Sequence, residues 1–356
     1  MRARPFLLMF LPALVAVSPA ARVGAAAAAD LAARPEGQQT KLLLGEAYPI
    51  EASVTFHAAL LHWLDSIAAL NGPGMTAGKT VEAHRQDYDD RLGALDDESV
   101  RELRSYAELR VGFAADHEGS AEALTAAFFE TPTLNDALER AGALLDEQSQ
   151  ERLRAALNHF APGYRLIWQS GESPQRFLRQ ALEAPERAEL QDFLVALTRF
   201  YGVDEVTRPN PRLILAPVRS GHGTHAQTLG RNLLIEVRDG EGLADQVGPI
   251  VHENAHFLYR NIGSKRREAL AARAARLSAA GPEAFRLLEE ALPTALAQGL
   301  AEERFRPGWQ AGSPWYHLPA VDRYAKRIFP LVKQALDERR TLDESLLREL
   351  IEAYRP

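Results

Sequence analysis

The chain has 356 residues, of which 46% are hydrophobic and 25% charged, so it is not intrinsically disordered and can form one large domain or two. Its formal net charge is −7, and no dense cluster of Lys and Arg indicates nucleic-acid binding. Cysteine is absent, which excludes disulfides, thiolate catalysis, zinc fingers, iron–sulfur clusters and lipid attachment through cysteine.

The N-terminus has the three parts of a secretory signal peptide. Arg2 and Arg4 give a positive start, an apolar stretch covers 6–17, and the small residues of 18–20 fit a signal-peptidase site. The apolar stretch is too short to span a bilayer, so we favour cleavage after Ala20 over an uncleaved anchor. We expect a secreted or periplasmic protein with no stable membrane insertion. An Ala-rich, disordered lead-in is expected over 21–40.

A helical N-terminal region is predicted over 41–202. Apolar residues recur at helical spacing in 52–70, and the Asn-Gly-Pro-Gly sequence at 71–74 ends that helix. Further amphipathic helices are predicted at 99–113, 133–145, 150–160 and 173–201. Their charged faces are typical of solvated surfaces.

The pattern changes at Val203, where a second region, 203–356, begins. Arg212–Val218 is a Leu- and Ile-rich run between prolines, and 224–229 and 233–237 flank a turn that contains Gly230. These segments predict a small antiparallel sheet over 212–237, and the rest of the chain is helical. The expected fold class is therefore mainly α with a small antiparallel β-sheet (α+β).

A metal-binding motif follows the predicted sheet. His252-Glu253-Asn254-Ala255-His256 has the spacing His-Glu-x-x-His. On a helix, predicted at 249–262, residues four apart share a face, so both imidazoles can bind one zinc ion. Glu253, one position along, can act as the general base toward a water molecule in the open coordination position.

This motif resembles the gluzincin superfamily of zinc metallopeptidases, and the resemblance covers residues 212–305. It implies an antiparallel sheet whose edge strand holds the extended substrate, and a glutamate as third zinc ligand on a second helix, here 283–305. The best match to the family context is Glu290, although Glu289 and Pro293 depart from the pattern. Glu302 is the alternative third ligand.

The resemblance also implies an oxyanion donor from a segment after the third ligand. Residues 315–319, Trp-Tyr-His-Leu-Pro, contain a tyrosine and a histidine, the two residue types that the family uses for this purpose. Tyr316 is the first choice and His317 the second, with aromatic packing under a loop as the alternative. His317 is too far from His256 to complete the three-histidine pattern of metzincins.

The remaining polar residues have weaker interpretations. His222 and His225 can face the cleft or bind a second metal, but an exposed hairpin is favoured. Asp245 is expected to cap the motif helix, and Asp322 or Glu268 can orient a ligand histidine. Five further histidines lack metal-ligand spacing and are interpreted as structural: His57, His62, His84, His117 and His159.

The expected function is an exported zinc metallopeptidase that hydrolyses a peptide or protein substrate. The alternative is a catalytically inactive exported binding or assembly protein that retains the metallopeptidase fold. A third possibility is a helical protein in which the motif is accidental. The sequence leaves the substrate, the choice between endo- and exopeptidase action, and the oligomeric state open.

Overall fold

The computed structural model describes residues 37–70, 82–116 apart from 83, 87 and 91, 120–170, 173–203, 210–218 and 225–355. The predicted signal peptide, most of the lead-in, His117 and His222 lie outside these residues. Residues Pro35–Pro356 form one compact unit. Within the described residues, no helix combines the length and the apolar character needed to cross a membrane.

Most of this unit is helical, which confirms the predicted α+β class. The strands are β1 (Gly37–Leu42), β2 (Glu51–Thr55), β3 (Arg212–Pro217), β4 (Ala226–Leu229) and β5 (Asn232–Val237). The helices before β3 are α2 (Phe56–Ile67), α4 (Asp97–Asp116), α5 (Ser120–Phe129), α6 (Leu134–Gly142), α7 (Glu147–Ser170), α8 (Ser173–Glu183) and α9 (Glu186–Tyr201). After β5 come α10 (Leu243–Asn261), α11 (Ser264–Leu277), α12 (Gly281–Thr294), the π-helix η2 (Ala295–Ala301), α13 (Glu302–Phe305), α14 (Pro319–Asp337) and α15 (Glu344–Glu352).

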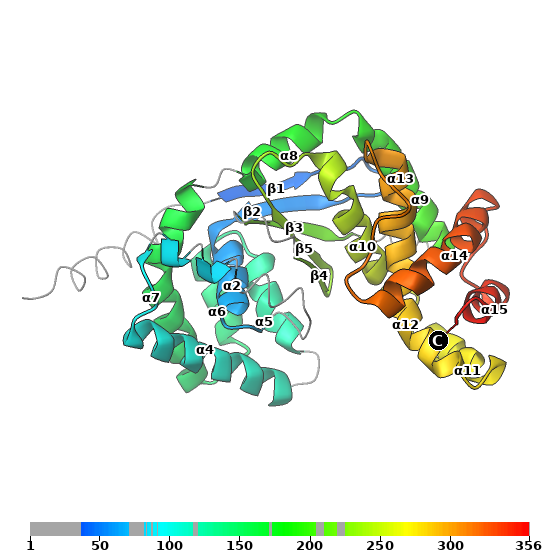
Figure 1. Ribbon diagram of the computed structural model, residues 1–356. Coiled ribbons are helices and arrows are strands. Elements are labelled where there is room, and N and C mark those ends of the chain that lie inside the picture. Colours follow the sequence, from blue (N-terminus) through cyan, green and yellow to red (C-terminus); the bar gives the residue numbers. More distant parts are fainter. Residues whose placement is uncertain are drawn as a thin grey trace, which may run out of the picture. The chain divides into compact units, whose positions relative to one another are not determined.

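The sheet is mixed, which corrects the expectation of an antiparallel one. Its five strands have the order β1-β2-β3-β5-β4, so the N-terminal strand β2 lies between β1 and β3 (Figure 1). Both β2–β3 and β3–β5 are parallel, whereas β1–β2 and β4–β5 are antiparallel. The predicted hairpin around Gly230 is present as β4–β5, and β4 is the terminal strand of the sheet.

The N-terminal region supplies two strands as well as helices. Residues 51–55, at the start of a predicted helix over 52–70, form β2, and α2 begins only at Phe56. Because β2 pairs with β3, the predicted boundary at 203 falls between two neighbouring strands of one sheet.

Helix α2 lies at the centre of the fold, since each of its residues is buried. A polar contact fixes it to α4: Asp65 accepts hydrogen bonds from Tyr106 Oη (2.6 Å) and Arg110 Nη2 (2.7 Å). A buried carboxylate requires such partners, so this contact specifies one packing of the two helices. It thereby also fixes the position of His62 on α2.

Candidate functional site

The His-Glu-x-x-His motif lies on α10, which begins at Leu243 rather than near the predicted 249. Asp245 Oδ2 accepts the backbone N–H of Gly242 (2.9 Å), so Asp245 caps this helix as expected. Gly248 and Pro249 lie inside the helix instead of starting it. A Cβ atom on Gly248 would lie 2.5 Å from Glu302 Oε1, so glycine allows α10 and α13 to approach closely here.

Helix α10 is held firmly in the core. Val251 and Ala255 have no exposed surface, and Tyr48 Oη donates a 2.5 Å hydrogen bond to Asn254 Oδ1 in the interior. Another side of the helix presents His252 and His256 to a cavity. Fixed backbone positions for both imidazoles follow from this packing.

The fold brings His252, His256 and Glu290 together. The His252 Nε2 and His256 Nε2 atoms are 3.2 Å apart. Glu290 Oε2, from α12, lies 3.5 Å from the first nitrogen and 3.6 Å from the second. His252 is buried, whereas His256 and Glu290 are partly exposed.

These separations suit a metal ion. Three ligand atoms bound to a tetrahedral zinc ion at about 2.0–2.1 Å are about 3.3 Å from one another. The observed distances of 3.2, 3.5 and 3.6 Å lie close to that value. The three residues therefore form a candidate metal site.

The negative charge of Glu290 is consistent with ligand chemistry. Burial raises the pKa of Glu290, but hydrogen bonds from His252 and His256 outweigh it and hold the pKa well below its usual range. Burial lowers the pKa of His252, but Glu290 and Glu253 outweigh it, so the net pKa is raised. Glu290 is therefore ionised at neutral pH, which is the form in which a carboxylate binds a cation.

Glu253 lies between the motif helix and the terminal strand of the sheet. It is 6% exposed, and Thr228 Oγ1 of β4 lies 2.7 Å from its Oε2 and 2.8 Å from its backbone oxygen. This contact fixes the carboxylate against β4 and beside the metal-ligand group.

A loop after α13 adds Tyr316 to the site. Its Oη donates a 2.9 Å hydrogen bond to Glu290 Oε2, and its ring stacks on that of His252 with centroids 6.0 Å apart. Asp322 accepts the backbone N–H groups of Trp315 (2.6 Å) and Tyr316 (3.2 Å), so it holds this loop rather than a ligand histidine. His317 is exposed and contacts the ring of Tyr316.

The predicted helix over 283–305 consists of α12, η2 and α13 in succession. Gln298, within the π-helix, places Oε1 3.4 Å from His252 Nδ1 and so can orient that imidazole. Glu302 pairs with Arg306 (3.0 Å) and packs against Gly248, one helical turn before His252, and it does not belong to the group of His252, His256 and Glu290. The π-helix η2 is an insertion within a longer helix, and π-helical turns are frequent at functional sites.

An open cavity of about 860 Å³ surrounds this site. Its walls include Ala226, Gln227 and Thr228 of β4, as well as Glu253 and Tyr316. A cavity of this volume beside a terminal strand has room for several residues of an extended peptide.

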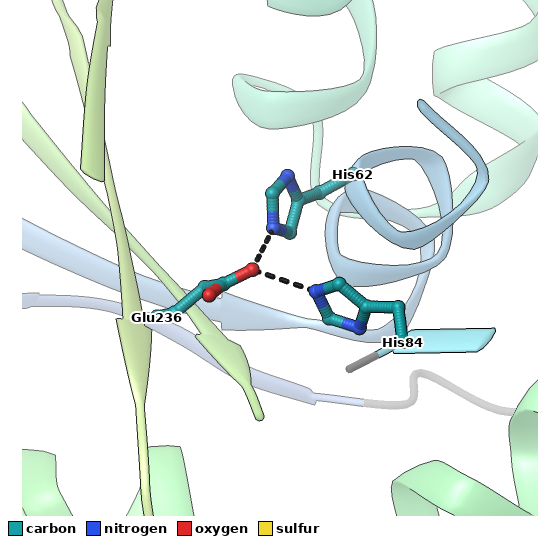
Figure 2. Close-up of side chains that lie close together, drawn as sticks. All are labelled: His62, His84 and Glu236. Carbon is teal, nitrogen blue, oxygen red and sulfur yellow. Dashed lines mark hydrogen bonds and ion pairs between the residues drawn. The ribbon is translucent and has the colours of Figure 1, made fainter. Parts of the chain in front are cut away.

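A second His/His/Glu group lies apart from this cavity and was missed in the sequence. His62 Nε2 and His84 Nε2 lie 2.8 and 2.7 Å from the same oxygen, Glu236 Oε1 (Figure 2). Burial raises the pKa of Glu236, but the two histidines outweigh it and hold the pKa well below its usual range. Burial is also the main cause of the lowered pKa of His62.

Other histidines have the structural contacts expected of them. His57 Nε2 lies 3.0 Å from the backbone oxygen of Thr131, and His159 lies 2.8 Å from Ser99 Oγ. His225, expected on an exposed hairpin, is instead partly buried and stacks on His62 with centroids 5.9 Å apart.

Comparisons with known proteins found no matching family model, no matching curated protein and no matching solved structure.

Proposed function

We propose that this protein is an exported zinc-dependent peptidase. The main support is the mutual separation of His252 Nε2, His256 Nε2 and Glu290 Oε2, which are 3.2–3.6 Å apart, with Glu253 next to them. Two imidazoles and one carboxylate are the ligand set of several catalytic zinc sites. The predicted signal peptide supports export.

Zinc bound to these ligands would polarise the substrate carbonyl and lower the pKa of a water molecule to about 7. Thr228 holds the Glu253 carboxylate in place, so this carboxylate can take the proton from the attacking water and pass it to the leaving amine. The terminal strand β4 lines the same cavity and can pair with an extended peptide through its backbone. Peptide-bond hydrolysis is therefore the reaction that best fits this arrangement.

Metal removal tests this proposal. We expect purified protein, dialysed against metal-free buffer, to retain zinc and to cleave members of a quenched fluorescent peptide library. A chelator should reduce cleavage to background, and added Zn²⁺ should restore it. Zinc content is measured by mass spectrometry and cleavage by fluorescence. Zinc binding without hydrolysis of any peptide would contradict the peptidase proposal and support the inactive binding protein.

Tyr316 is proposed to stabilise the oxyanion that forms in the transition state. We expect Tyr316→Phe to lower kcat by about 10²–10³-fold, because one positioned donor is removed. The zinc content should be unchanged, since Tyr316 contacts Glu290 without being part of the ligand group. His317→Ala is the control, and its exposed side chain predicts near wild-type kinetics. A larger loss of kcat in the control would assign the role to His317.

A further inference from the structure

The second His/His/Glu group joins three parts of the chain that are distant in sequence. His62 comes from α2, His84 from a helical segment within 82–92, and Glu236 from the strand β5 (Figure 2). One potential ligand atom from each residue lies within 4.8 Å of the others. Both imidazoles point their Nε2 atoms at the carboxylate, so the group converges on one point.

The burial of this group is unusual for such polar residues. His62 and His84 are each 2% exposed, and Glu236 is 0% exposed. Among the described residues, no Lys or Arg forms an ion pair with Glu236; its other oxygen accepts the backbone N–H of His225 (3.0 Å). A fully buried carboxylate is costly unless a positive charge compensates it. A bound divalent cation would supply that charge.

Two of the three distances between the ligand atoms require little change to accept such an ion, and the two imidazoles offer nitrogens within 4.8 Å of each other. The two nitrogen–oxygen distances, 2.8 and 2.7 Å, would each lengthen by about 0.5 Å to reach the spacing around tetrahedral zinc. The neighbouring His225 provides a further nitrogen: its Nε2 is buried and has no hydrogen-bond partner among the described residues. This nitrogen is available to form a hydrogen bond with a fourth metal ligand, such as a water molecule.

We propose that His62, His84 and Glu236 bind a second divalent transition metal, preferentially zinc, in a structural role. Imidazole and carboxylate together favour zinc over the oxygen-seeking cations Mg²⁺ and Ca²⁺. The site is closed to substrate, because its three residues are buried and none of them lines the open cavity. It would connect α2, the segment around His84, and β5.

This site would also support the candidate peptidase centre through one strand. The backbone N–H of Glu236 donates a hydrogen bond to the backbone oxygen of His225, the residue before β4, and Thr228, three residues after His225, holds Glu253. A metal ion at Glu236 would therefore fix one end of β4, whose other end contacts the proposed general base. The inference does not depend on peptidase activity, since it concerns different ligands and a different readout.

Metal content in a variant that lacks the first site tests the proposal. The full chain with His252→Ala and His256→Ala leaves all residues of the buried group intact. After incubation with Zn²⁺ and dialysis, we expect about one zinc ion per chain, measured by mass spectrometry. Replacement of this zinc ion by Co²⁺ should give absorption bands in the visible range. A folded double variant with less than about a tenth of an ion per chain would overturn the proposal. If the double variant does not fold, Glu290→Gln serves as the background, because Glu290 is partly exposed.

Two matched substitutions on α2 locate the remaining metal. In the same background, His62→Gln should reduce zinc below about a tenth per chain, whereas His57→Gln should retain it. Both variants lose a buried imidazole from α2, so packing costs are similar. Equal zinc content in the two variants would overturn the assignment of His62. If His62→Gln fails to fold, His84→Asn takes its place, and a chelator-induced fall in Tm of the background variant is the second measurement.

Discussion

Glu253→Gln should abolish most peptidase activity while leaving the metal bound. Glutamine has the shape of glutamate and can still accept the hydrogen bond from Thr228, so β4 and α10 should stay in place. It cannot take a proton from water, and loss of a general base lowers kcat by about 10²–10⁴-fold. Steady-state kinetics and zinc analysis of the same preparation measure the two effects separately.

The control for this variant is Glu289→Gln. Glu289 lines the same cavity and carries the same charge, but it is exposed and lies outside the ligand group. It should keep kcat within a few-fold of wild type, because only a distant charge is removed. Turnover of Glu253→Gln within tenfold of the control would rule out Glu253 as the base.

The second prediction with a large expected effect concerns the third zinc ligand, for which the sequence analysis left Glu290 and Glu302 as candidates. We expect Glu290→Gln to weaken zinc binding by more than about 100-fold, since even residues that only support a ligand change affinity by 10–100-fold. Activity should be lost at limiting zinc and recover in part at high zinc. Competition with a chromophoric chelator gives the affinity.

Glu302→Gln provides the comparison for this experiment. Glu302 pairs with Arg306 and packs on Gly248, so the substitution removes a partly exposed ion pair worth about 0–1 kcal/mol. Zinc affinity and kcat should be unchanged. Loss of zinc in Glu302→Gln, with Glu290→Gln unaffected, would reverse the proposed ligand assignment.

The fold class was accessible from the sequence, but the first strands of the sheet were not. Strand β2 is buried along most of its length and continues directly into the fully buried α2. Its sequence, Glu-Ala-Ser-Val-Thr, alternates polar and apolar residues, but this alternation covers only five residues and runs directly into the helical spacing of α2. The prediction therefore placed a helix over 52–70.

The predicted sheet topology was wrong for a related reason. The turn at Gly230 identified the β4–β5 hairpin, because its chemistry is local. The parallel pairing of β3 with β5 depends instead on which strand lies at the edge. Local sequence carries no information about that choice, so three consecutive strands were taken as antiparallel.

In the candidate site, the sequence predicted the contact that depends on local spacing, but it did not predict the contacts between residues far apart in the chain. The i, i+4 spacing predicted that His252 and His256 share a helix face, as found. The role of Asp322 differs from expectation, because it holds the backbone of a loop, and the placement of Gln298 beside His252 by the π-helix was not predicted.

Only one feature of the amino-acid sequence pointed to the buried group of His62, His84 and Glu236. Glu236 is a lone charged residue in the sequence Asn-Leu-Leu-Ile-Glu-Val of a fully buried strand, where a carboxylate requires a partner. Its two histidine partners lie 174 and 152 positions away in the sequence, so no motif spacing connects them.

The π-helix η2 also has a consequence for how this site tolerates insertions and deletions. A π-helix closes i→i+5 hydrogen bonds, so it contains one residue more than an α-helical segment at the same place. Removal of a single codon between 295 and 301 would let regular α-helix form and would leave the segments on either side close to their present orientation. Gln298, which lies within the π-helix, would lose its place beside His252 although it had not been substituted, whereas Glu302, which follows the π-helix, would stay beside Gly248.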